Sequence, residues 1–88
     1  MKTIKDKQYS FNHTNLRLKE RYDMEITMED YDYFCHRIQT KDYISLVNIE
    51  YQKDDKQYVY DLQFPRRGDI RVVWSEKRQL ITTVLERN

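Results

Sequence analysis

The hydrophobic pattern of this chain changes its period once, and that change limits the folds open to it. Up to about Thr40, apolar residues recur at spacings of three and four, which is typical of helices with one buried face. From Tyr43 onward, apolar and polar residues alternate in short segments, which is typical of half-buried strands. We therefore expect helices followed by strands, an α+β arrangement in which the two kinds of element are segregated along the chain.

The first helix is predicted to begin near Asn12. Phe11, Leu18 and Tyr22 then fall on one side of it, at spacings of seven and four, and form its buried stripe. The preceding residues 1–10 are polar and rich in lysine, so they are predicted to form a flexible arm or an edge strand.

The second helix has a clearer start signal. The residues TMED at 27–30 resemble a capping box, in which Asp30 takes the place of the usual Glu or Gln. The helix is predicted to end near Thr40. Its buried stripe follows helical spacing and consists of Met28, Tyr31, Phe34, Cys35 and Ile38.

Four strands are expected in the rest of the chain. They are predicted over residues 43–52, 57–64, 70–75 and 80–86. A phase slip at Leu46 and Val47 predicts a bulge in the first of them. The turns between strands are short, which implies antiparallel neighbours. One face of the sheet would cover the helix pair, so the whole chain, residues 1–88, is predicted to form a single two-layer domain.

Composition narrows the class of protein. Aromatic residues make up 14% of the chain, which argues against disorder because disordered chains lack large apolar side chains. The formal net charge is only +1, whereas a dedicated non-specific nucleic-acid binder usually has a large basic excess. Binding to RNA or DNA would therefore need a local basic patch.

Cysteine usage and hydropathy indicate a cytoplasmic protein. The single cysteine, Cys35, cannot form an internal disulfide, as is usual in a reducing compartment. The first ten residues lack the apolar region of a signal peptide, and no apolar run approaches the roughly 18 residues of a membrane helix. Neither a metal-ligand spacing nor a glycine-rich phosphate loop is present, so no metal and no cofactor are expected.

Charge is unevenly distributed along the chain. Residues 23–32 contain five acidic side chains and no basic one, whereas residues 64–78 contain five basic side chains against two acidic ones. The basic side chains form a candidate nucleic-acid-binding set, in which Tyr58, Tyr60 and Trp74 could stack on bases. The alternative interpretation is that the charged side chains lie in solvated turns and that the aromatic rings pack in the core. The members of the set are Arg66, Arg67, Arg71, Lys77 and Arg78.

His13, Arg17 and Arg21 are spaced four residues apart, which places them on one face of the first helix. Histidine can transfer a proton near neutral pH, and arginine binds phosphate through paired N–H donors. RNA cleavage requires both functions, because the 2′-hydroxyl loses a proton while charge grows on the phosphate. The alternative is a solvated face on which Arg17 pairs with Glu20.

Two segments resemble a known family. NHTNLRLKERYDMEITMEDYDYF (12–34) and RVVWSEKRQLITTVL (71–85) are similar to the N-terminal and C-terminal motifs of small phage and plasmid proteins near the RelE, HigB and BrnT toxin-like proteins. That family has two helices followed by four strands. The resemblance therefore implies a RelE-like ααββββ domain.

The resemblance also implies an activity. Many members are metal-independent ribonucleases that are blocked by an antitoxin. Transferred to this chain, His13 is the general base or acid, Arg17, Arg21 and Arg71 stabilise the phosphate, and Thr83 positions it. The near-neutral charge departs from the strongly basic character of ribosome-dependent toxins.

Two further functions remain open. The first is a non-catalytic phage protein that binds and inhibits a host factor, with the acidic residues 23–32 docking on a basic partner. The second is a domain that binds a small nucleotide-like anion. The expected partner is thus RNA or a protein, either an antitoxin or a host factor.

Overall fold

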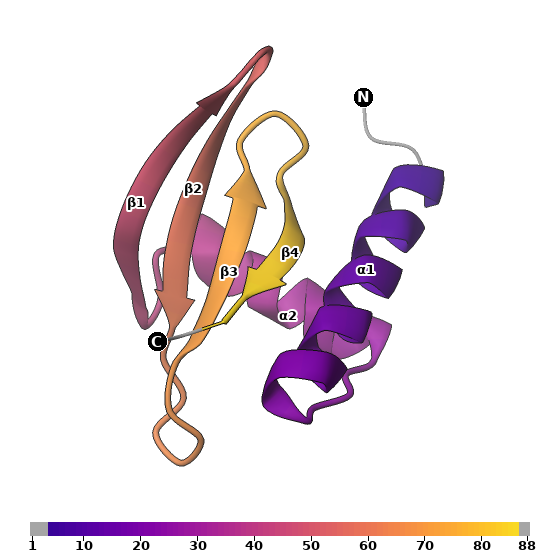
Figure 1. Ribbon diagram of the computed structural model, residues 1–88, viewed down its shortest axis with the longest axis vertical. Helices are drawn as coiled ribbons and strands as arrows, with labels where there is room; N and C mark the ends of the chain where they lie inside the picture. Colours follow the sequence, from indigo (N-terminus) through magenta and orange to yellow (C-terminus); the bar gives the residue numbers. More distant parts are fainter. Residues whose placement is uncertain (1–3, 87–88) are drawn as a thin grey trace.

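The computed structural model describes residues 4–86, and it consists of two helices followed by one antiparallel sheet (Figure 1). The elements are α1 (Ile4–Tyr22), α2 (Met28–Gln39), β1 (Ile44–Gln52), β2 (Asp55–Leu62), β3 (Ile70–Ser75) and β4 (Leu80–Leu85). Strands that are consecutive in the sequence are neighbours in the sheet, so β1 and β4 form its two edges. The predicted α+β fold with two helices and a four-stranded antiparallel sheet is confirmed.

The start of α1 differs from the prediction. The helix begins at Ile4 and not near Asn12, so the prediction of an arm or edge strand over residues 1–10 is wrong for residues 4–10. Residues 1–3 lie outside the described part of the chain. The buried stripe of α1 includes Ser10 and Thr14 together with Leu18, at a spacing of four. Because two of these side chains are polar, hydrophobic periodicity does not reveal that the first half of the helix is buried.

The capping box of α2 is confirmed. The Asp30 N–H donates to Thr27 Oγ1 at 3.1 Å, and the Thr27 N–H donates to Asp30 Oδ2 at 3.0 Å. These two bonds satisfy N–H groups that a helix start otherwise leaves without partners. The helix ends at Gln39, next to the predicted Thr40, and its buried residues include Tyr31, Phe34, Cys35 and Ile38.

The strands follow the predicted pattern with small shifts. β3 has the predicted bounds, whereas β2 runs from Asp55 to Leu62 and so lies two residues earlier than expected at both ends. The predicted bulge in β1 is present, because Leu46 pairs with Tyr60 while Asn48 pairs with Val59. A second irregularity, between β3 and β4, was not predicted.

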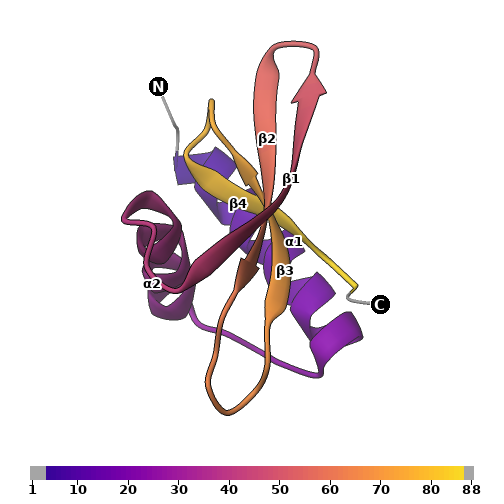
Figure 2. The same ribbon diagram turned by 90° about the vertical axis from the view of Figure 1, so that its left-hand side faces the viewer.

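The two helices cover different parts of the sheet (Figure 2). α2 lies against one face, whereas α1 runs beside the edge strand β4 (Figures 1 and 2). The core forms between α2, Leu18 of α1 and the side chains on that face of the sheet. These sheet residues include Tyr60, Leu62, Ile70, Val72, Trp74, Ile81 and Val84. Within residues 4–86, no helix combines the length and the apolar character that crossing a membrane would require.

Arg37 is a buried cation that joins α2 to the sheet. Its Nη2 donates at 2.8 Å to the carbonyl oxygens of both Tyr43 and Gln63, and its Nε donates at 3.2 Å to that of Asp42. The guanidinium also lies 4.8 Å from the centre of the Phe64 ring. A buried charge is tolerated when it is hydrogen-bonded in this way. Arg37 therefore holds the start of β1, while the rest of that strand extends away from the helices (Figure 1).

Candidate functional site

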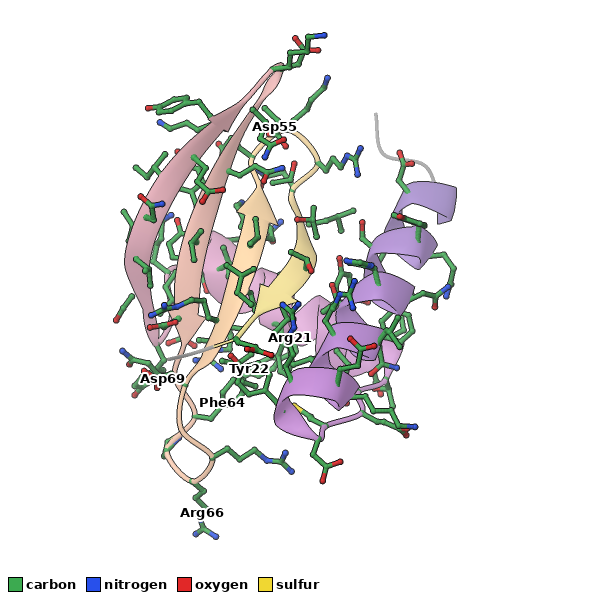
Figure 3. All side chains as sticks on the ribbon, in the orientation of Figure 1. Arg21, Tyr22, Asp55, Phe64, Arg66 and Asp69 are labelled. Atoms are coloured by element: carbon green, nitrogen blue, oxygen red, sulfur yellow. The ribbon has the colours of Figure 1, made fainter. Side chains whose placement is uncertain are left out.

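The cationic face of α1 is present, and its side chains contact neighbours within the molecule. The His13 ring is stacked with the Tyr9 ring at a centroid distance of 6.3 Å. Arg17 Nη1 donates to Glu20 Oε1 at 2.6 Å. Arg21 reaches across to β4, where its Nη1 donates to the carbonyl oxygen of Val84 (Figure 3).

Arg71 is held by Asp61, which lies directly opposite it on β2. The Arg71 Nε and Nη2 groups donate to the two Asp61 oxygens at 2.9 and 3.2 Å, so the pair is bidentate. The side chain of Asp61 is 12% exposed and that of Arg71 is 29% exposed. The hydrogen bond to Asp61 raises the pKa of Arg71 above its usual value. The Asp61 carboxylate therefore offsets part of the charge that Arg71 would present to a phosphate.

Two of the five predicted catalytic residues, Arg21 and Arg71, lie at the end of α1. Tyr22 Oη donates to the Leu85 carbonyl oxygen at 2.7 Å and accepts from the Arg71 N–H at 3.1 Å. This places Arg21, next to Tyr22, close to β3 and β4 (Figure 3). Thr83 shares the sheet face of Arg71, because it pairs with Val73 two residues farther along β3.

His13 does not join that group. It precedes Arg21 by eight residues in the same helix, which corresponds to about 12 Å along the helix axis. Arg17 lies between them, one turn from each. A general base must come within hydrogen-bond reach of the proton that it removes. A substrate would therefore have to span this distance to contact both His13 and Arg21.

The predicted nucleic-acid-binding set is divided between opposite ends of the sheet. Arg66 and Arg67 lie in the loop between β2 and β3, where Arg66 points away from the body of the protein (Figure 3). Lys77 and Arg78 lie in the turn between β3 and β4, at the other end (Figure 1). Two of the three rings proposed to stack on bases, Tyr60 and Trp74, are buried in the core, which leaves Tyr58 partly exposed.

A hollow of about 790 Å³ lies between the tip of the β1–β2 hairpin, the β3–β4 turn and the first turn of α1. Its lining has both signs of charge, with three acidic and three basic side chains. They are Asp6, Asp54, Asp55, Lys53, Lys77 and Arg78. None of the five predicted catalytic residues lines it.

Asp55, which lines this hollow, accepts several hydrogen bonds. It accepts from Ser75 Oγ at 2.6 Å, from the Lys77 N–H at 3.0 Å and from Gln57 Nε2 at 3.5 Å. Burial alone would raise the pKa of Asp55, but these hydrogen bonds outweigh it and lower the pKa below 3.8. Asp55 therefore fixes the β3–β4 turn against the hairpin.

Sequence reasoning missed a cluster of exposed apolar side chains, which lies on β1. Eight of its nine residues are exposed. Leu46 is 53% exposed, Val47 42%, Ile49 36% and Tyr51 78%. The available signal was the apolar pair Leu46–Val47, because a strand cannot bury two consecutive side chains on the same face.

The two edge strands of the sheet differ in how far the helices cover them. At β4, side chains of both helices donate to backbone carbonyl oxygens: Thr14 and Tyr31 donate to that of Ile81, and Arg21 donates to that of Val84. At β1, the residues of the strand are exposed along the edge. Free strand edges are templates for pairing with another strand, and proteins usually block them with lysine, proline or a covering element. Residues 44–52 contain neither lysine nor proline.

Two lysines, Lys41 before β1 and Lys56 on β2, contact the tyrosines of the β1–β2 hairpin. Lys41 Nζ donates to Tyr60 Oη at 2.9 Å, which raises the Lys41 pKa. Lys56 Nζ lies 5.3 Å from the Tyr58 ring centre and 5.8 Å from that of Tyr51. At these distances the ammonium groups make cation–π contacts with the rings.

Comparison of the chain with protein-family models, with curated proteins and with solved structures found no match. Within residues 4–86, no three side chains of the metal-ligating types gather into a group that could hold a metal ion.

Proposed function

We propose that this protein acts by binding a protein partner along β1 and not by catalysis. The observation that supports the proposal is the free edge of β1, which combines unblocked backbone with four exposed apolar side chains. An extended segment of a partner can add to such an edge, where main-chain hydrogen bonds supply affinity and side chains supply specificity. For a phage-type or plasmid-type protein, the partner would be a cytoplasmic host factor or an antitoxin.

The state of the predicted catalytic groups also favours binding. Arg17 is paired with Glu20, Arg21 with a carbonyl oxygen of β4, and Arg71 with Asp61. Catalytic cations need to reach the charge that develops on a substrate. Here each cation already donates to a partner inside the protein, and a carboxylate offsets the charge of Arg17 and of Arg71.

The test is capture of partners from a cell lysate by the wild-type protein and by two matched variants. Val47→Lys places a charge on the free edge, whereas Leu16→Lys places the same charge on an exposed leucine of α1. We expect Val47→Lys to lose the partner and Leu16→Lys to keep it. If both variants keep the partner, the proposal is contradicted.

A metal-independent ribonuclease is a second candidate, and one observation favours it. Arg21 and Arg71 both adjoin Tyr22, Thr83 lies on the same face of the sheet as Arg71, and cations with a hydroxyl are groups that can hold a phosphate. RNA cleavage in EDTA by wild type, Arg71→Ala and His13→Ala tests it, with Leu16→Ala as an exposed control. If Arg71→Ala and His13→Ala lose cleavage while the control variant keeps it, the ribonuclease function is established. If wild type does not cleave RNA, the ribonuclease candidate is ruled out.

A further inference from the structure

We infer that the hollow between the β1–β2 hairpin tip, the β3–β4 turn and the first turn of α1 binds a phosphorylated sugar. Its lysine and arginine side chains would hold the phosphate, and its carboxylate and amide side chains would hold the hydroxyl groups. The volume of about 790 Å³ lies within the range of about 300–1,000 Å³ that is usual for small-molecule sites. Binding there does not depend on the proposed function, because Gln52, at the end of β1, is the one residue of that strand in the lining.

Three cations at the hollow make no ion pair with another residue in the described part of the chain, 4–86. They are Lys53 at the hairpin tip and Lys77 and Arg78 in the β3–β4 turn, and all three are exposed. Other cations do pair with carboxylates: Lys7, Arg17, Lys19 and Arg71. Cations that gather at a hollow without such partners raise the positive potential there, which favours an anion. Phosphate is the anion that lysine and arginine side chains bind most readily in proteins.

Asp55 lines the same hollow, between the hairpin and the β3–β4 turn (Figure 3). Its oxygens already accept from the Ser75 hydroxyl at 2.6 Å and from the Lys77 N–H at 3.0 Å. Ser75 Oγ in turn accepts from the Arg78 N–H at 3.0 Å. These bonds fix the backbone of the turn before any ligand binds, which lowers the entropy cost of binding. Asp55 therefore holds the turn in place and leaves the Lys77 and Arg78 side chains available to a ligand.

The lining selects a hydrophilic ligand. All ten described side chains that line the hollow are polar or charged, so they offer neither an apolar wall nor an aromatic ring on which a nucleobase could stack. Gln52 and Asp54 are exposed in this lining, and their oxygen atoms can accept hydrogen bonds from hydroxyl groups. A phosphorylated sugar has partners for both kinds of group, whereas inorganic phosphate has partners for the cations alone.

NMR titration of the isotope-labelled full chain tests the ligand class. The probes are ribose 5-phosphate and glucose 6-phosphate, compared with inorganic phosphate and with the two free sugars. We expect at least one sugar phosphate to bind about tenfold more tightly than inorganic phosphate, because its hydroxyl groups add hydrogen bonds. The free sugars should bind more weakly than the sugar phosphates. If neither sugar phosphate binds more tightly than inorganic phosphate, the inference is overturned.

The positions of the shifted resonances test the site. Binding should shift the amide resonances of residues 52–54 and 76–79, which form the hairpin tip and the β3–β4 turn. Tyr22 and Arg71, which lie at the other end of the sheet, should be unaffected. Shifts that centre on Arg71 would overturn the assignment of the ligand to the hollow.

Two variants separate the phosphate from the sugar. Arg78→Ala should weaken binding of the sugar phosphate and of inorganic phosphate alike by about tenfold, because both lose a charged donor. Asp54→Ala should bring the two affinities closer together, because the hydroxyl groups lose an acceptor. Lys19→Ala removes an exposed cation near the opposite end of α1 and is the control, with unchanged affinity. Arg78→Ala that binds as tightly as wild type would overturn the role of the turn.

This inference and the proposed function fail separately. Val47→Lys should keep sugar-phosphate binding, because Val47 does not line the hollow. A protein that binds no sugar phosphate but loses its cellular partner with Val47→Lys overturns the ligand and leaves the proposed function standing.

Discussion

Tyr31 Oη donates a 2.6 Å hydrogen bond to the Ile81 carbonyl oxygen, and this bond ties α2 to the edge strand β4. Thr14 Oγ1 of α1 donates to the same oxygen at 3.4 Å, so both helices meet at one backbone atom. Burial is the main cause that raises the pKa of Tyr31 well above its usual value, so the hydroxyl remains a donor. The β4 edge is thereby closed to further strands, which leaves β1 as the open edge of the sheet.

We expect Tyr31→Phe to destabilise the protein by about 1–3 kcal/mol, because a buried carbonyl oxygen loses its shorter hydrogen bond. Urea unfolding followed by circular dichroism would measure the loss. Tyr33→Phe on the same helix is the control, since Tyr33 is exposed and should change stability by less than about 0.5 kcal/mol. Equal effects of the two variants would contradict a structural role for the Tyr31 hydroxyl.

Arg71→Ala should destabilise the protein far more than Arg17→Ala. Removing Arg71 leaves the mostly buried Asp61 carboxylate without its bidentate partner, at a cost of about 1–3 kcal/mol after allowance for its partial exposure. Arg17 and Glu20 form an exposed pair that contributes only about 0.5 kcal/mol. The midpoints of urea unfolding compare the two variants. A smaller loss for Arg71→Ala/Asp61→Leu than for Arg71→Ala would confirm that the unpaired carboxylate is the cause.

Asp55 should make stability depend on pH in acid. Folding lowers the pKa of Asp55, so the folded state favours the carboxylate; the stabilisation is complete above pH 3.8 and is lost as the pH falls below that value. Asp55→Asn should therefore be less stable than wild type at about pH 7, and the difference should shrink at about pH 3. Urea unfolding at both pH values measures it. Asp54→Asn, the exposed neighbour, is the control; a difference that is the same at both pH values would contradict the role of Asp55.

Arg37→Ala should cost about 2–4 kcal/mol, because three carbonyl oxygens at the start of β1 and the end of β2 lose a charged donor. Hydrogen exchange should show the loss of protection concentrated at the first residues of β1 and in α2. Arg67→Ala, in the exposed β2–β3 loop, is the matched control. An unchanged exchange rate at Ile44 in Arg37→Ala would contradict the anchoring role.

Elements with local signals were predicted well. The start of α2 was recognised because Thr27 and Asp30 satisfy each other within one turn, and the β1 bulge because Leu46 and Val47 interrupt a strict alternation. The start of α1 was missed because Ser10 and Thr14 are buried by contacts with the rest of the molecule, one of them to a strand 67 residues away. Such contacts leave no trace in the pattern of neighbouring residues.

In the candidate site, too, local spacing could be predicted and long-range contacts could not. Four-residue spacing placed His13, Arg17 and Arg21 on one helix, but only the packing of α1 against β4 determined that Arg21 would reach Val84. Arg71 was recognised as a cation, whereas its pairing with Asp61 depends on the register of β2 and β3.

By itself, the sequence determined the order of helices and strands, the cap of α2, the bulge and the antiparallel sheet, because each depends on periodicity or on side chains a few residues apart. Only the tertiary structure decided which strand edge is closed and which is open, and which charges have partners. Those properties arise when segments far apart in the chain meet, since burial and hydrogen bonding depend on distance in space and not along the sequence.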